Sequence, residues 1–518
     1  MRSGKWLLVV LTAFLFLAGA SLSMAEKILR TNLPADPSQT DPITVSELYA
    51  GDVLDNVYEG FTDIDKDGRV TPTLAVSWES TDGGKTLKFN LRKGVKFHSG
   101  NPFTARDVKF TFEQLLIPDN KGGLAAPYLK SVTGAKDILD GKTKELSGVK
   151  IVDDLTVTVT FDTPSVQFPI FPFRFIDSAL IRSRGLGILK DTSVGTGPFK
   201  FVHWKRGQEV RLEANKNYWG QAPQIDAVVY KIVPELDTAL NMFEAKELDL
   251  VFIDRGASRR VLRGSEYKDK LLTAPAAQVQ FFGMNQNLYP PFKDIRVREA
   301  MCSVIDREAM VQGIFDGAAF PLYGFVVPGF PGSNPNIAPL KTDLAKAKKL
   351  LADAGYPGGK GLPPISITGT SANKEELAYF ADLLQKQLGM TVEIKTMERG
   401  NFIKAMNVGE LPMIHWGWSA DYADAATFLD DMWHSKSPYN RTKWANAEYD
   451  ALIEKARMTF DAKERYRIYN QAEAILLKDM GQCPTVMRKM VAVVSPKVKG
   501  VILTPFRLQN FNTVKIDD

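Results

Sequence analysis

The chain has 518 residues, of which 44% are hydrophobic and 24% carry a charge. These proportions are those of a globular protein of about three domains, and they exclude a disordered chain, a collagen-like repeat and a polytopic membrane protein. Lys and Arg exceed Asp and Glu by only five, 65 against 60. This small surplus gives no support to nucleic-acid binding, because that function needs basic residues gathered on one face.

Residues 1–25 have the pattern of a secretory signal peptide. Arg2 and Lys5 precede an apolar run over 6–20, and Ser-Met-Ala at 23–25 predicts cleavage before Glu26. The alternative is a membrane anchor, since the run is close to the shortest that spans a bilayer. No Cys follows the run, so we expect no lipid attachment. We therefore predict export to the periplasm of a Gram-negative cell.

Strand and helix patterns alternate along the rest of the chain. Alternating apolar residues predict strands, and apolar residues spaced three or four apart after a capping residue predict helices. A helix followed by a short strand, as at 373–395, is typical of an α/β lobe. The predicted strands are 87–91, 155–161, 228–232 and 391–395, and the predicted helices are 104–116, 341–355, 373–389 and 461–479.

The chain has two cysteines, Cys302 and Cys483. Cys302 falls within a helical pattern, and Cys483 stands before Pro484 in a strand-like pattern. In an exported protein the two could form a disulfide, and two buried free thiols are the alternative. Two cysteines in a chain of this length cannot replace a core, which excludes a disulfide-built scaffold.

The residues that could carry out catalysis or bind a metal do not form a recognisable set. The four histidines lack metal-ligand spacing. Three aspartates within 63–67 resemble the start of a calcium loop, but Leu74 stands where that loop needs a bidentate Glu, which favours a polar hairpin turn. Asp430 and Asp431 could act in glycoside hydrolysis, although adjacent acids are common on solvated helices. We predict no enzyme, no cofactor and no metal site.

Five long segments indicate the function more strongly than these residues do, through their amino-acid sequences, their order and their spacing. They are LRKGVKFHSGNPFTARDVKFTFEQLL (91–116), GTGPFKFVHWKRGQEVRLEANKNYWG (195–220), FEAKELDLV (243–251), DIRVREAMCSVIDREAMV (294–311) and GWSADYADAATFLDDM (417–432). Together they resemble the family 5 extracellular solute-binding proteins, which are the receptors of ABC importers for peptides, nickel and oligosaccharides. The resemblance covers nearly the whole chain after the signal segment.

The resemblance implies an α/β fold with two hinged lobes, the type II periplasmic binding protein fold, with an extra inserted α/β domain. The first lobe would comprise 26–69, 195–284 and 493–518, the inserted domain 70–194, and the second lobe 285–492. The chain would cross between the lobes near 284 and 492. A monomeric receptor would close on its solute and deliver it to an inner-membrane ABC permease with a cytoplasmic ATPase.

The same resemblance implies a ligand site in the segment HWGWSADYADAATFL (415–429). Asp421 occupies the position that pairs with the ligand's α-ammonium in peptide-binding members, and the alternative is that it caps the helix that follows. An extended peptide would pair with backbone groups of Gly417, Trp418 and Ser419. Its other edge would meet Ser46, Glu47 and Leu48.

Two departures from the family pattern leave the ligand open. Asp424 is followed by Ala where members usually have Pro, and the segment 366–378 lacks the Arg that dipeptide-binding members use for the ligand carboxylate. Arg399 or Arg441 could replace it, and the alternative is that both are ordinary surface charges. Trp418 and Trp433 could stack on a ligand or pack in the core.

Short peptides are the leading ligand on these grounds. The alternatives of the same class are an oligosaccharide, an opine and a chelated metal. A secreted hydrolase would need a catalytic set that the sequence does not show. A holdase that accepts unfolded segments in its cleft is a further alternative.

Overall fold

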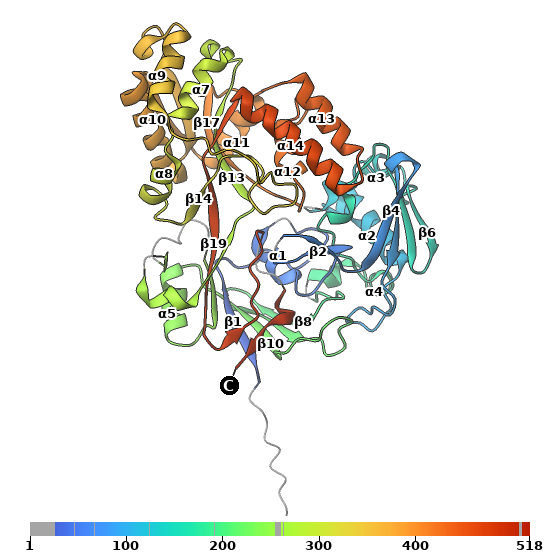
Figure 1. Ribbon diagram of the computed structural model, residues 1–518. Coiled ribbons are helices and arrows are strands. Elements are labelled where there is room, and N and C mark those ends of the chain that lie inside the picture. Colours follow the sequence, from blue (N-terminus) through green and yellow to red (C-terminus); the bar gives the residue numbers. More distant parts are fainter. Residues whose placement is uncertain are drawn as a thin grey trace, which may run out of the picture.

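The computed structural model describes residues 26–45, 47–66, 68–123, 125–190, 192–253, 261–262, 264–506 and 510–517. The predicted signal peptide, 1–25, and Ser46 lie outside the described residues. Within the ranges above, we find no helix with the length and hydropathy that a membrane span requires. Figure 1 shows three bodies: a lobe with yellow and orange helices, a lower lobe built on a sheet, and a third, blue to cyan body beside them.

An eight-stranded mixed sheet forms the lower lobe. Its order is β12-β19-β11-β1-β10-β9-β8, and β14 pairs with β19. β1 runs parallel to β10 and β11. Helix α5 (Leu236–Glu244) covers it, with Leu240 and Phe243 packed near Val491. The strands are β1 (Ile28–Leu33), β8 (Phe199–Lys205), β9 (Glu209–Ala214), β10 (Ala227–Ile232), β11 (Leu250–Ile253), β12 (Leu271–Pro275), β14 (Ala319–Pro321) and β19 (Val486–Val494).

A five-stranded sheet is the centre of the upper lobe. Its order is β16-β15-β17-β13-β18, and β15 runs parallel to both of its neighbours. The strands are β13 (Gln278–Met284), β15 (Ile365–Thr370), β16 (Val392–Met397), β17 (Met413–Ser419) and β18 (Gln482–Pro484). The helices are α7 (Ile295–Ser303), α8 (Arg307–Gly313), α9 (Leu344–Asp353), α10 (Lys374–Leu388), α11 (Arg399–Val408), α12 (Ala426–Trp433), α13 (Ala447–Arg457) and α14 (Ala462–Asp479).

The third body has a four-stranded antiparallel sheet in the order β4-β5-β7-β6. Its phenylalanine core includes Phe61 of the preceding segment, whose ring stacks on Phe89 at 4.1 Å between centroids. The inserted domain therefore shares a core with the first lobe. Its elements are β4 (Ala75–Thr81), β5 (Thr86–Leu91), β6 (Val149–Asp153), β7 (Thr156–Thr160), α2 (Ala105–Leu116), α3 (Ala135–Leu139) and α4 (Ser178–Arg184).

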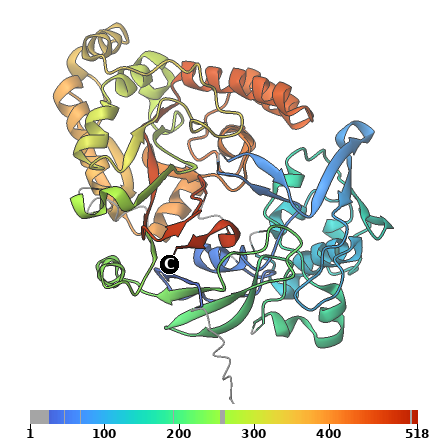
Figure 2. The ribbon, with the colours of Figure 1, turned by 60° about the horizontal axis from the view of Figure 1, so that its bottom comes forward.

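The centre of the molecule lies between these bodies. Helix α1 (Leu48–Leu54) and the C-terminal segment are neighbours there (Figure 2), and the Phe511 N–H donates to Asn56 Oδ1 at 2.9 Å. The two small sheets of the structure are β2 (Thr62–Ile64) with β3 (Val70–Pro72), and β20 (Val498–Lys499) with β21 (Lys515–Ile516).

The chain passes from one large sheet to the other before and after the upper lobe, and in between it adds only the short strand β14 to the eight-stranded sheet among the described residues. It leaves the eight-stranded sheet after β12, joins the five-stranded sheet at β13, and returns at Thr485 between β18 and β19. The expected crossings near 284 and 492 are therefore too late by most of a strand. The reason is that an apolar strand pattern predicts a strand but not the sheet that it joins.

A disulfide joins Cys302 of α7 to Cys483 of β18, which resolves the alternatives that the sequence left open. Both residues are buried in the core of the upper lobe. The bond closes a stretch of 181 residues and ends two residues before Thr485, where the chain returns to the lower lobe. It therefore secures the second crossing strand to the helical layer of its own lobe.

Glu473 on α14 makes the stability of the fold depend on pH. One carboxylate oxygen accepts from the Phe325 and Val326 N–H groups at 2.7 and 2.9 Å, and burial raises the pKa of Glu473 to about 7. The folded state therefore binds a proton that the unfolded state has already released at neutral pH. The stabilisation that this proton gives is complete below the pKa of Glu473 in the unfolded chain. It is lost as the pH rises through the pKa of Glu473 in the folded protein.

Glu473→Gln keeps a neutral acceptor at every pH. We expect the free energy of unfolding of the variant, relative to that of the parent, to increase by about 3 kcal/mol as the pH rises from 5 to 8. The reason is that a shift of one pKa unit corresponds to about 1.4 kcal/mol. Chemical denaturation of both proteins across this range measures the difference. A difference that does not change with pH would mean that Glu473 does not carry the proton.

Candidate ligand-binding site

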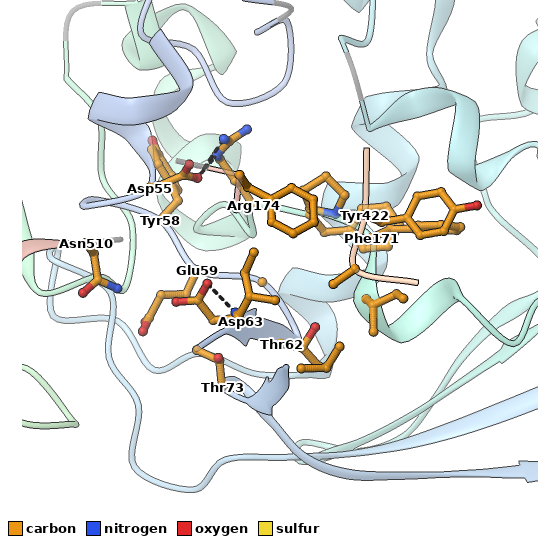
Figure 3. A pocket seen from close by; sticks show the side chains of 18 of the residues that line it. Asp55, Tyr58, Glu59, Thr62, Asp63, Thr73, Phe171, Arg174, Tyr422 and Asn510 are labelled. Carbon is orange, nitrogen blue, oxygen red and sulfur yellow. Dashed lines mark hydrogen bonds and ion pairs between the residues drawn. The ribbon is translucent and has the colours of Figure 1, made fainter. Parts of the chain in front are cut away.

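Asp421 lies where the three bodies of the molecule meet. It follows β17 and lines three hollows, with volumes of about 90, 1100 and 400 Å³. The smallest is lined by residues of the first lobe, the inserted domain and the second lobe (Figure 3), and in it Phe171 meets Tyr422 at 5.1 Å between ring centroids. A ligand seated at Asp421 would therefore touch all three bodies.

The predicted residues of the second lobe come together in the hollow of about 400 Å³, which we call the β17 chamber. Beyond Ile414, β13 is the only described strand that pairs with β17, because pairing with β15 stops there. The other edge of β17 around Trp416 thus has no strand beside it, as strand addition by a ligand requires. The chamber is lined by six of the residues named from the sequence: Arg399, Gly417, Trp418, Ser419, Asp421 and Arg441.

The Asp421 carboxylate has no ion-pair or hydrogen-bond partner among the residues that the structure describes. Its side chain reaches water between the lobes, yet protein atoms surround it on most sides, and this loss of hydration raises the pKa of Asp421. A cation placed beside it would restore the lost stabilisation of the charged form.

The helix-capping alternative for Asp421 is wrong. The first N–H of α12, at Ala426, is bound by Asp424 Oδ1 at 3.0 Å. Asp424 is itself buried and forms an ion pair with Arg465 of α14 at 2.8 Å. Asp424, the second Asp of the motif, therefore binds the start of α12. Asp421, the first Asp, is left to line the cleft.

Thr427 fixes the position of Asp421 and of the neighbouring indole. Its buried hydroxyl oxygen accepts from the Asp421 N–H and from Trp418 Nε1, each at 3.3 Å. We expect Thr427→Val to weaken ligand binding by about 1–2 kcal/mol, because a net hydrogen bond contributes about 1 kcal/mol. Thr427→Ser keeps the oxygen and should bind as the parent does in calorimetry. Equal loss in both variants would point to packing of the methyl group instead.

Two arginines lie close to one tryptophan in the β17 chamber. The guanidinium carbon of Arg441 lies 5.0 Å from the Trp416 ring centroid and that of Arg399 lies 5.8 Å from it. Burial lowers the pKa of Arg441, and its Nε donates to Asn407 at 3.2 Å. Arg488, on the same wall, pairs with Glu376 at 3.4 Å. No pattern in the sequence indicates that Arg488 joins this wall.

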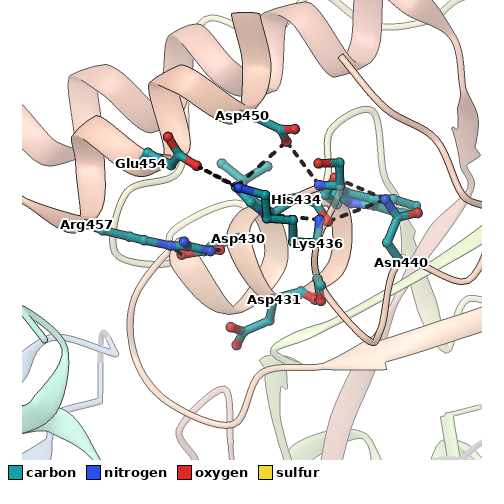
Figure 4. A network of polar contacts seen from close by, with 12 residues as sticks. Asp430, Asp431, His434, Lys436, Asn440, Asp450, Glu454 and Arg457 are labelled. Carbon is teal, nitrogen blue, oxygen red and sulfur yellow. Dashed lines mark hydrogen bonds and ion pairs between the residues drawn. The ribbon is translucent and has the colours of Figure 1, made fainter. Parts of the chain in front are cut away.

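The hollow of about 1100 Å³ extends from Asp421 toward the inserted domain, where Tyr128 lines it. Asp431 of α12 also lines it. Its neighbour Asp430 forms an ion pair with Arg457, whose Nε lies 2.7 Å from Oδ2. Asp431 points away from that pair (Figure 4), and its carboxylate accepts from the Tyr422 hydroxyl at 2.9 Å. Burial and the nearby Asp430 raise the pKa of Asp431 to about 8.

The remaining predicted residues lie elsewhere. Trp433 is 1% exposed and packs between Phe281 and Phe325 at 5.2 and 5.1 Å, so its predicted contact with a ligand is corrected to core packing. Glu47 precedes α1, does not line these three hollows, and accepts from the Ser38 N–H. Leu48 is the first residue of α1, where the backbone is already helical.

Known proteins share this organisation. A solved structure described as an MppA murein tripeptide binding protein, in an unliganded open form, matches with a TM-score of 0.85 and 24% identity over 95% of this chain and 98% of its own. DppA from Helicobacter pylori, in complex with the peptide STSA, matches with a TM-score of 0.71 and 26% identity over 95% and 99%.

The sequence relatives cover the chain almost completely. Heme-binding protein A of Haemophilus influenzae is 30% identical over 89% of this chain and 85% of its own, and dipeptide-binding protein DppE of Bacillus subtilis is 28% identical over 93% and 90%. A model of bacterial extracellular solute-binding proteins, family 5, matches residues 69–440. The chain therefore belongs to the family 5 bacterial extracellular solute-binding proteins.

Proposed function

We propose that this protein captures short peptides in the periplasm and delivers them, unchanged, to an ABC permease. One observation carries the proposal: the Asp421 carboxylate has no cationic partner among the described residues, and it lies where the three bodies meet. A peptide's α-ammonium supplies the missing charge in a charge-assisted hydrogen bond, and this bond also fixes which end of the ligand enters first.

The rest of the peptide has two supports in the same place. The edge of β17 around Trp416 and Trp418 offers backbone groups that do not depend on side-chain identity. The hollow of about 1100 Å³ gives room for side chains beyond the first residue. The names of DppE and of the DppA complex support a peptide ligand, whereas haem and deoxycholate in the names of other relatives are the competing ligands.

Closure of the lobes would convert binding into a signal. The TM-score is higher to the open form of MppA than to the peptide complex of DppA, which supports an open arrangement of the lobes here. A ligand shifts the equilibrium toward the closed form only through contacts that exist in that form alone, and here these are contacts to the first lobe and the inserted domain. The permease can then distinguish a loaded receptor from an empty one by shape. A monomer suffices for this role.

The export route remains part of the proposal. A cleaved signal peptide over 1–25, without lipid attachment, would place the receptor in an oxidising compartment, and the disulfide between Cys302 and Cys483 is consistent with that compartment.

Identification of the co-purifying ligand tests this function. The protein is purified from its native host, unfolded, and the released small molecules are analysed by mass spectrometry. Short peptides are expected from the parent protein and not from Asp421→Asn purified in parallel. Recovery of haem, a bile acid or a glycan in equal amounts from both proteins would overturn the proposal.

A further inference from the structure

The β17 chamber has more positive charge than one carboxylate can neutralise. Arg399 has no carboxylate partner among the described residues, and the acid beside it, Glu398, is occupied by the Gly400 and Asn401 N–H groups. Among the described residues, the hydrogen-bond partner of Arg441 is the neutral Asn407 side chain, which accepts from Nε. The one acid that lines the chamber is Asp421, which the proposed function assigns to a cation of the ligand.

Unsatisfied donors in the wall point to a missing acceptor. Arg441 Nη1 and Trp416 Nε1 are both buried, and neither has a hydrogen-bond partner among the described residues. Buried donors are nearly always paired in a folded protein, so an unpaired donor on a residue of a cavity wall points to an acceptor that the cavity would hold. Both belong to residues that line the chamber.

We infer that the β17 chamber binds a ligand end that carries two anionic groups, and that the receptor prefers short peptides with a C-terminal acidic residue. One carboxylate is the C-terminus and the other is the acidic side chain. Each guanidinium then gains one carboxylate in a site partly shielded from water, where such a pair is stronger than at the surface. This inference rests on the proposed function for the opposite end of the ligand.

Matched peptides that differ by one charge test the preference. Calorimetry would compare Ala-Glu with Ala-Gln, and Ala-Ala-Glu with Ala-Ala-Gln, on the parent protein and on Arg399→Gln/Arg441→Gln. The parent should bind the acidic peptide about tenfold more tightly, the scale of one additional charge-assisted contact. The double variant should lose that ratio. Arg106→Gln/Arg467→Gln removes the same charge from exposed sites outside the chamber and should keep it.

Each outcome separates this inference from the function on which it rests. Equal affinity for acid and amide in the parent, or a preference that survives in the double variant, overturns the inference and leaves peptide binding intact. If neither peptide binds, free glutarate is the second probe, with thermal stabilisation as the readout. Stabilisation by glutarate that depends on Arg399 and Arg441 would keep the dianion site and overturn the peptide function, whereas no stabilisation would overturn both.

Discussion

Replacement of Asp421 by Asn should weaken the binding of short peptides by about 2–5 kcal/mol, the range for loss of one partner of a desolvated ion pair. Asn has the shape of Asp but cannot balance an ammonium. The Asp421 N–H bond to Thr427 belongs to the backbone and remains, so the loop keeps its position. Isothermal titration calorimetry measures the loss, which should fall mainly on the dissociation rate.

The ligand supplies the control for this result. Acetylation of the peptide's amino group removes the ammonium and should weaken binding to the parent protein by a similar amount, but should add little to the loss in Asp421→Asn. Asp154→Asn removes the same charge from an exposed residue of the inserted domain and should bind as the parent does. Additive losses from acetylation and from Asp421→Asn would show that the two groups do not meet.

Removal of the disulfide should give the largest loss of stability. Cys302→Ala/Cys483→Ala should lower the free energy of unfolding by about 3–5 kcal/mol, because the bond closes a stretch of 181 residues and so restricts the unfolded chain. Two buried side chains also lose their sulfur atoms, which leaves a small cavity in the upper lobe. Equilibrium denaturation measures the change.

The reduced parent protein is the matched comparison. Denaturation of the parent in the presence of reductant should reproduce the loss, and reductant should leave the double alanine variant unaffected. The affinity for peptides should fall less than the stability, because neither cysteine lines the three hollows around Asp421. Unchanged unfolding of the parent after both thiols are shown to be free would contradict the prediction.

Local signals in the sequence predict the elements well. Thr104 and Asp107 form the predicted capping box at the start of α2, and α10 ends at Gly389 in a left-handed conformation (φ 68°). α14 begins after Asp461, as expected. These signals succeed because each depends on a few consecutive residues whose backbone geometry is decided locally.

Contacts between distant segments are the part that the sequence does not provide. The Cys302–Cys483 pairing and the wall formed by Arg399, Arg441 and Arg488 join stretches far apart in the chain. Asp421 could be named because a family motif surrounds it. Trp433 was ambiguous because an indole that packs in a core and one that faces a ligand have the same sequence pattern.

All but one of the residues that line the β17 chamber belong to the upper lobe, and the exception, Arg488, stands near the start of β19, just after the chain has returned to the lower lobe. A ligand can therefore bind to the upper lobe while the cleft is open, and the lower lobe and the inserted domain then close over it. The association rate then depends on the charges of the upper lobe. The dissociation rate depends on how stably the lower lobe and the inserted domain close over the ligand. Substitutions in the inserted domain should accordingly change the dissociation rate of the ligand and leave its association rate unchanged.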